Sequence, residues 1–274
     1  MADSVVIERQ DGTTYTLEQL GMRVISFNPP GPNIQHTFQS LGTYKNLWTD
    51  MHVQRLTIPL IFDVYAIDNY DYELQRLKVL EIFRSHEEFY VYTTRTPYLR
   101  WRVVAESFAY PRMANYWLAN NVSVNLVCAT GYAETVQTTL DPFTFDRNTW
   151  GLDLGVNLAD PPQYTFTNQN KVTFINLGAI PLLCEQHPVI IKFIGNVSKQ
   201  LTIKNDTTNQ TWTLNRKLTK NDQLIINGMV PVVNNTMVFE QCNHSYLDYS
   251  IGKNQIEISG ATDFSISFET RFYY

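Results

Sequence analysis

Alternation of apolar and polar residues with a period of two recurs along most of this chain and favours a fold built mainly of β-strands. In residues 55–64 (RLTIPLIFDV), Leu56, Ile58, Leu60 and Phe62 all fall on one face. Such alternation is typical of a strand with one buried side. Four further segments of the first half are predicted to be strands: 23–27, 89–94, 100–108 and 121–130.

The second half continues this pattern and contains a predicted β-hairpin at 201–214 (LTIKNDTTNQTWTL). Apolar residues alternate on both sides of the polar stretch NDTTNQ, which is rich in turn-forming residues. A second pair of strands is expected near the end of the chain, where NQIEIS and FSISFETRFYY flank a predicted turn, GATD (260–263).

Residues 68–85 depart from the period of two and predict a helix. Asp68 is the expected N-cap, and a second aspartate, Asp71, follows three residues later. Four apolar residues recur at three-residue steps: Leu74, Leu77, Leu80 and Phe83. The stripe is broad and imperfect, so we expect this helix to pack against a sheet.

The regular pattern is lost at about 131–163, which is rich in Pro, Asp and Gly. Such a segment is typical of a connector. The sequence therefore predicts a mostly β chain with one helix, divided into an N-terminal domain (1–135), a connector (136–163) and a C-terminal domain (164–274).

Composition argues against several classes of function. Charged residues make up 17% of the chain, against roughly 25% in an average domain, and the net charge is −5 with no basic run. We therefore expect no specific binding of nucleic acid. No apolar stretch approaches the ~18 residues of a membrane span, and the first residues do not resemble a signal peptide. Membrane insertion is not expected, and synthesis in a cytoplasm is.

No catalytic or metal-binding pattern is recognisable. Cys128, Cys184 and Cys242 are far apart, without the short spacings of a zinc site, and Cys128 fits a buried position in an alternating strand. The adjacent Glu87 and Glu88 are typical of a solvated loop. We predict no catalytic residues, no metal site, no cofactor and no enzymatic activity.

Three aromatic residues of the second half admit two interpretations. Trp212, Tyr246 and Tyr249 could form a platform on which a sugar stacks. Trp212, however, is in phase with Leu214, which favours a place in the core, and the two tyrosines suit an edge or interface equally well.

The stretch 26–55 is long, polar and punctuated by Pro and Gly, yet it is too apolar for simple disorder. Its apolar residues are Phe38, Leu41, Tyr44, Leu47 and Trp48. An arm that docks on a neighbouring subunit would explain them. A local hairpin lying on its own domain is the alternative.

Taken together, these landmarks resemble the distal tail proteins (Dit family) of siphophages. The resemblance rests on the order and spacing of segments over nearly the whole chain. They are DGTTYTLEQLGMRVISF (11–27), RLTIPLIFDVYAIDNYDYELQRLKVLEIF (55–83), FYVYTTRTPYLRWRVVAESF (89–108), residues 187–228 and SIGKNQIEISG (250–260).

The resemblance implies a mostly β fold. An N-terminal β-sandwich-like ring domain would carry one α-helix and a protruding arm, and the C-terminal domain would be a galectin-like β-sandwich. It implies a hexameric hub ring at the virion tail tip, with roles in host attachment and DNA passage. The implied partners are other copies of the chain, the major tail tube protein, the tail-associated tip protein and, further, a receptor-binding protein and the tape measure protein.

The alternative function is a carbohydrate-binding adsorption module, in which the C-terminal sandwich binds cell-wall glycans. An exposed aromatic platform would favour that function, whereas a packed Trp212 would weaken it.

Overall fold

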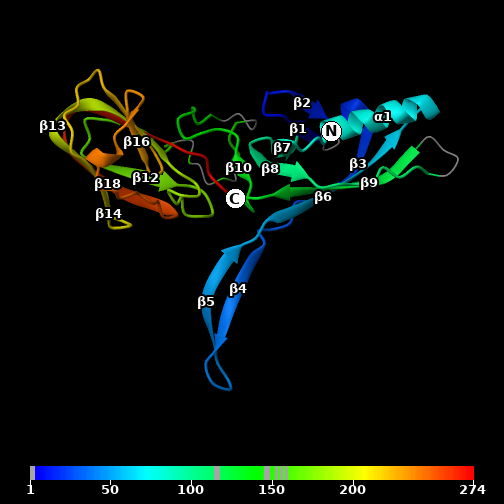
Figure 1. Ribbon diagram of the computed structural model, residues 1–274, viewed down its shortest axis with the longest axis horizontal. Helices are drawn as coiled ribbons and strands as arrows, with labels where there is room; N and C mark the ends of the chain where they lie inside the picture. Colours follow the sequence, from blue (N-terminus) through cyan, green and yellow to red (C-terminus); the bar gives the residue numbers. More distant parts are fainter. Residues whose placement is uncertain (1–3, 114–117, 145–148, 152–153, 155–156, 158–159) are drawn as a thin grey trace. The chain divides into compact units, whose positions relative to one another are not determined.

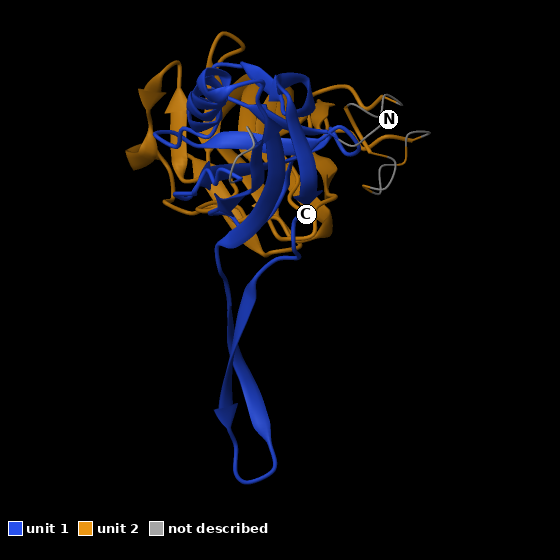
Figure 2. Ribbon diagram, turned by 90° about the vertical axis from the view of Figure 1, so that its right-hand side faces the viewer, with its two compact units in different colours: residues 1–134 blue, residues 135–274 orange. Residues whose placement is uncertain are grey.

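The computed structural model describes residues 4–113, 118–144, 149–151, 154, 157 and 160–274. The chain divides into two compact units, Met1–Glu134 and Thr135–Tyr274 (Figures 1 and 2). Residues of the predicted connector thus count with the second unit, and Trp150 is buried there with its ring centroid 4.4 Å from that of Phe143.

The first unit is built around one antiparallel sheet that runs in the order β2-β1-β7-β8-β9-β6-β3, with β10 paired to β8. Its strands are β1 (Val5–Glu8), β2 (Thr14–Thr16), β3 (Met22–Phe27), β6 (Leu56–Tyr65), β7 (Phe89–Thr93), β8 (Leu99–Ala105), β9 (Leu118–Cys128) and β10 (Glu134–Thr135). A short 3₁₀ helix, η1 (Glu18–Leu20), precedes β3.

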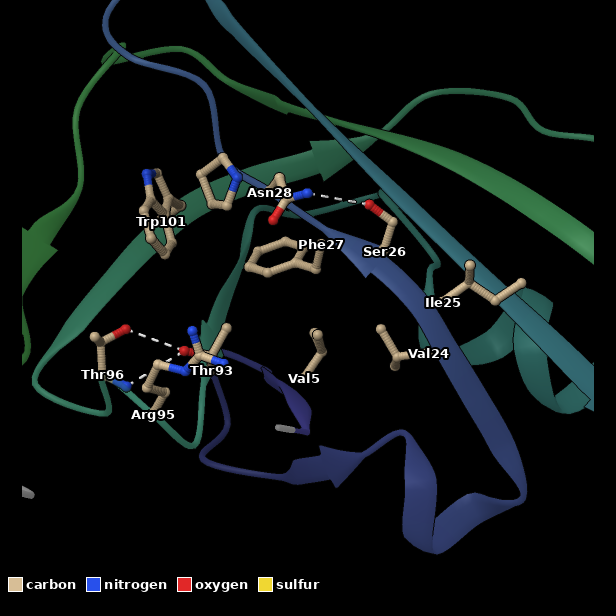
Figure 3. Close-up of a pocket in the computed structure, with 11 residues that line it drawn as sticks. Val5, Val24, Ile25, Ser26, Phe27, Asn28, Thr93, Arg95, Thr96 and Trp101 are labelled. Atoms are coloured by element: carbon tan, nitrogen blue, oxygen red, sulfur yellow. Dashed lines mark hydrogen bonds between the residues drawn. The ribbon is translucent and has the colours of Figure 1, made fainter. Parts of the chain in front are cut away.

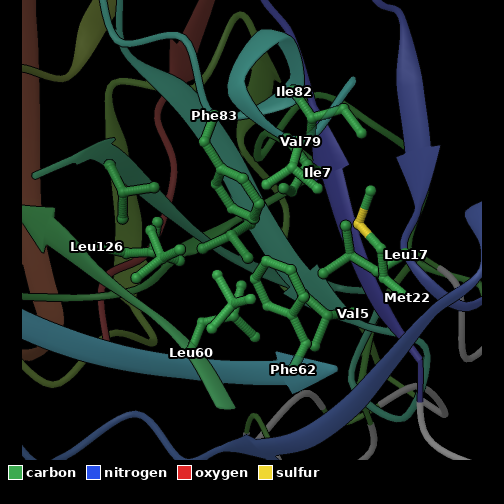
Figure 4. Packing of buried hydrophobic residues seen from close by; sticks show 14 of the residues in the cluster. Val5, Ile7, Leu17, Met22, Leu60, Phe62, Val79, Ile82, Phe83 and Leu126 are labelled. Carbon is green, nitrogen blue, oxygen red and sulfur yellow. The ribbon is translucent and has the colours of Figure 1, made fainter. Parts of the chain in front are cut away.

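This sheet is sandwich-like because residues from both of its halves meet in one core. Ile7 and Val91 come from the β1 and β7 side, whereas Leu60 and Leu126 come from β6 and β9, and all four are fully buried in one cluster (Figure 4). The period-two faces predicted for 55–64 and 121–130 supply the second half of this cluster.

Helix α1 (Asn69–Ile82) begins as predicted, since the Asp68 side chain accepts a hydrogen bond from the Asp71 amide at 2.8 Å. Its buried side chains are Tyr72, Val79 and Ile82. Val79 and Ile82 point into the core, with Phe83 beside them (Figure 4).

The helix packs on the core as predicted, but the stripe at three-residue steps is not the face that it buries. Of the four residues at three-residue steps only Phe83 is buried; Leu74, Leu77 and Leu80 are exposed, with Leu77 at 59%. Three residues advance an α-helix by about 300°, so a stripe with this spacing drifts around the axis instead of forming one face. The helix is therefore apolar on its core side and on its solvent side.

The 26–55 stretch forms a two-stranded antiparallel hairpin of β4 (Ile34–Ser40) and β5 (Asn46–Val53), here called the arm. The arm pairs with no other strand and projects from the first unit, away from α1 (Figures 1 and 2). It does not lie back on its own domain, which was the alternative interpretation of this stretch.

The second unit is also an antiparallel sheet, in the order β11-β18-β13-β15-β16-β17, with β12 paired to β18 and β14 to β13. Its strands are β11 (Thr165–Thr167), β12 (Lys171–Asn176), β13 (Ile190–Asn205), β14 (Gln210–Leu214), β15 (Gln223–Asn227), β16 (Val230–Val233), β17 (Thr236–Met237) and β18 (Gly252–Glu269). A 3₁₀ helix, η3 (Phe239–Gln241), follows β17.

Strands β13 and β18 pair along most of their length and both belong to two layers. One half of this pair carries β12 and β14, the other carries β11 and β15, and the register shifts between the halves. Phe174 of β12 and Phe268 of β18 meet between the layers, with ring centroids 5.8 Å apart. This arrangement makes a β-sandwich from a single sheet.

The predicted turn at 260–263 is a bend within β18 and not the end of a strand. At Gly260, φ is +83°, and a Cβ built there would lie 1.9 Å from the carbonyl oxygen of Gln200 on β13. Glycine allows both the backbone conformation and the close approach, so the strand passes the bend without ending.

The hairpin predicted at 201–214 is confirmed as β13–β14, with Leu201 opposite Leu214 and Ile203 opposite Trp212. The prediction of a mostly β chain is confirmed as well, and α1 is the one α-helix within the described residues. The likeness of the second unit to galectins stays a prediction.

Candidate functional site

The arm has two chemically different faces. Residues that lie opposite each other across the two strands share a face, and the register places Phe38 opposite Trp48, His36 opposite Met51 and Ile34 opposite Val53 on the first. The second face is lined by Gln35, Thr37, Gln39, Leu47, Asp50 and His52. The arm is therefore an amphipathic ribbon. We call its first face, formed by Ile34, His36, Phe38, Trp48, Met51 and Val53, the apolar arm face.

Aromatic rings cluster on the apolar arm face. The His36 ring lies 6.3 Å from that of Phe38 and 5.8 Å from that of Trp48, centroid to centroid. Phe38 is nevertheless 61% exposed and Trp48 56% exposed. A two-stranded hairpin is only marginally stable alone in water, and contiguous exposed apolar side chains mark interaction surfaces. The apolar arm face is the candidate functional site.

The five residues predicted to form an interface arm lie on three different parts of the arm. Phe38 and Trp48 lie on the apolar arm face, Leu41 and Tyr44 lie in the connecting turn, and Leu47 lies on the opposite face. All five are exposed.

Sequence reasoning missed four members of the apolar arm face: Ile34, His36, Met51 and Val53. Alternation within 34–40 would have indicated the first two. The extra residue Thr49, at which the register shifts, hides Met51 from the period-two pattern.

A pocket of about 420 Å³ lies near the base of the arm, between β3 and the β7–β8 turn (Figure 3). Phe27 and Trp101 meet edge to face there, 6.1 Å apart, and Asn28 donates a hydrogen bond to the Ser26 hydroxyl. Its lining includes Arg95 but no carboxylate, histidine or cysteine. Those residues supply no group suited to general acid–base catalysis near neutral pH.

The proposed glycan platform is corrected by the structure. Trp212 is 3% exposed and Tyr249 1% exposed; of the three residues only Tyr246 is on the surface. Trp212 faces the core because it lies opposite Ile203, and Tyr249 packs on Phe174 with ring centroids 4.6 Å apart. The three residues do not form a surface on which a sugar can stack.

The polar residues singled out in the sequence have structural partners. Glu87 accepts a hydrogen bond from the buried Arg9 at 2.9 Å, and Glu88 forms an ion pair with Arg102 at 3.3 Å.

Burial raises the pKa of the Cys184 and Cys242 thiols to about 11. The described part of the chain contains no group of His, Cys, Asp and Glu side chains arranged to hold a metal ion. In the same residues, no helix has the length and hydropathy to cross a membrane.

Comparison with known proteins identifies the first unit. Residues 10–128, which include the arm, match the family model "Phage tail protein RIFT-related domain". These residues form a phage tail protein RIFT-related domain. A comparison with curated proteins found no match.

The chain as a whole has a solved structural counterpart. The crystal structure of SPP1 Dit (gp 19.1), described as a paradigm of the hub adsorption apparatus in phages that infect Gram-positive bacteria, matches with a TM-score of 0.71. The match covers 98% of this chain and 99% of the other at 8% sequence identity. The two share a fold over nearly their whole lengths.

Two structures of the phage P2 baseplate in its activated conformation, one with Sr and one with Ca, also match. Their TM-scores are 0.47 and 0.46, each at 8% identity with 98% of both chains covered. The predicted resemblance to siphophage distal tail proteins is supported by the family model over residues 10–128 and by the fold shared with SPP1 Dit.

Proposed function

We propose that this phage tail protein forms a hexameric hub ring at the tail tip, linking the tail tube to the tip and receptor-binding apparatus. The observation that carries the proposal is the apolar arm face, which projects from a phage tail domain with no other strand of the described chain paired to it. A second copy of the chain would cover it. The SPP1 Dit fold, described as a hub, supports the same role.

Low charge and an acidic balance suit such a ring. A hub contacts several proteins over broad polar and aromatic surfaces, and its partners would be the major tail tube protein, the tail-associated tip protein, a receptor-binding protein and the tape measure protein. The net charge of −5 also suits DNA passage, because Lys and Arg along a channel would bind the phosphate backbone by releasing counterions. The proposed site of action is the virion tail tip, after synthesis in the host cytoplasm.

The decisive measurement is the mass of the purified chain by light scattering across a concentration series. One chain has a mass of 31.7 kDa, so six chains give about 190 kDa. We expect the hexamer, or a stacked pair of hexamers, to appear as concentration rises. Negative-stain images of the same sample should show rings.

Two matched variants test whether ring assembly depends on the apolar arm face. Phe38→Lys places a charge on the apolar arm face, and Leu47→Lys places the same charge on the opposite face at a residue that is also exposed. We expect Phe38→Lys to shift the sample to the mass of one chain and Leu47→Lys to keep the parent mass. A parent chain that remains monomeric at every concentration would contradict the proposal. Rings that tolerate Phe38→Lys would show that the apolar arm face does not hold the subunits together.

A further inference from the structure

The solvent side of α1 presents a second apolar surface that the chain itself does not cover. Tyr70, Leu74, Leu77 and Leu80 are all exposed along it, with the exposed Glu73 and Glu81 among them, and we call the four apolar residues the outer helix face. They recur at steps of three and four residues, which places them on one side of a helix. The opposite side carries the buried Tyr72, Val79 and Ile82 and packs on the core (Figure 4).

A helix that is apolar on two opposite sides is typical of a helix buried between two layers. The first layer is the core of its own unit. The described residues of the single chain supply no second layer, and the arm of the same chain cannot provide it because the arm projects away from α1 (Figures 1 and 2). Each chain thus has one projecting apolar surface and one uncovered apolar surface, at separate places on the same unit.

We propose that the outer helix face receives the apolar arm face of a second copy of this chain, an inference that rests on the ring proposed above. A contact between two different patches, one from each chain, is heterologous and can repeat from subunit to subunit until a ring closes. Each copy then donates one arm and receives one arm, and neither apolar surface remains in water.

The dimensions of the two surfaces agree. From Ile34 to Phe38 the arm advances roughly 14 Å at about 3.4 Å per residue. From Tyr70 to Leu80 the helix advances about 15 Å at 1.5 Å per residue. At 150–250 Å² per aromatic side chain, the exposed parts of Phe38 and Trp48 on the apolar arm face offer roughly 230 Å². That is about a quarter of what one partner contributes to a standard interface.

The test is cross-linking of the full-length chain with a short bismaleimide. Met51→Cys lies on the apolar arm face and Leu77→Cys on the outer helix face; both parent residues are exposed, whereas the three native cysteines are buried. The control is His52→Cys with Leu77→Cys, because His52 is the next residue of β5 and faces the other way. Light scattering before cross-linking establishes that each double variant keeps the parent mass.

We expect the Met51→Cys/Leu77→Cys chain to give a ladder of covalent products up to the mass of the ring. The control should give at least about tenfold less product. Rings that form without this ladder would overturn the inference and leave the proposed function intact. Products that stop at two chains would overturn it too, since they indicate symmetric pairing of two copies. A chain that never assembles would overturn both proposals.

Discussion

Phe38 and Trp48 lie directly opposite each other across the two strands of the arm, on a face exposed to solvent. Trp212, by contrast, lies opposite Ile203 within a core. Both tryptophans belong to hairpins with alternating patterns. The chain therefore contains two tryptophans in similar local structures, one positioned to bind and the other to stabilise.

The first prediction compares alanine substitutions at these two tryptophans. Trp212→Ala removes a fully packed side chain and should lower the free energy of unfolding by about 3–5 kcal/mol. Trp48→Ala should change it by no more than about 0.5 kcal/mol. Urea unfolding followed by circular dichroism, at a concentration low enough to prevent association, measures both. Equal losses would contradict the assignment of Trp48 to an interface.

The second prediction concerns the bend in β18. Gly252 and Gly260 have nearly the same φ, +80° and +83°, but only Gly260 faces a backbone oxygen that a Cβ would strike. Gly252→Ala should therefore cost about 1–2 kcal/mol of conformational strain. Gly260→Ala should cost a further 1–3 kcal/mol or so, because the two strands must move apart. Thermal unfolding of the two variants would show this difference, and equal melting temperatures would refute the steric explanation.

The third prediction concerns the buried Arg100. Its guanidinium lies 2.9 Å from a Glu134 carboxylate oxygen and 3.5 Å from Glu8, and it stacks 3.5 Å above the Tyr90 ring. Arg100→Met would leave Glu134 with a poorly compensated charge and should cost about 3–5 kcal/mol. Adding Glu134→Gln should recover part of that loss. Chemical denaturation of the single and double variants measures the recovery; additive losses would mean that the two side chains are not coupled.

The fourth prediction concerns thiol chemistry. Burial holds the pKa of Cys184 and Cys242 near 11, above the usual value of 9.0. Iodoacetamide at pH 8 should label neither thiol in the folded chain and both in urea, as mass spectrometry would show. The raised pKa favours the protonated form in the folded state, so its contribution to stability is complete below about pH 9. That contribution should be lost as pH rises from about 9 to 11. Rapid native labelling would indicate that the thiols are accessible.

The helix shows how far the sequence could predict this structure. Its start could be predicted because Asp68 caps the first turn through a local hydrogen bond. Its orientation could not be read from three-residue steps, since Leu74 and Phe83 lie about 180° apart around the axis. The core side is marked instead by Tyr72 and Val79, seven residues apart.

The arm and the bend in β18 could likewise be predicted from the sequence only in part. Exposed aromatic residues in a polar stretch predicted a projecting segment, but the face that each residue occupies depends on the register shift at Thr49. The GATD sequence has the composition of a turn, yet β18 continues through it because β13 runs alongside with a matching irregularity. Only the paired strand distinguishes a bend from a hairpin. The burial of Tyr249 could not be predicted for a similar reason, because it depends on contact with Phe174 of the distant strand β12.

Because β13 and β18 each run through both layers of the second unit, neither layer can open without breaking the hydrogen bonds of the other. We therefore expect the amides of these two strands to exchange with deuterium at a common, slow rate set by global unfolding. A pulling force applied to either layer would likewise be carried along the same two strands. Under load, such a unit would move as one body.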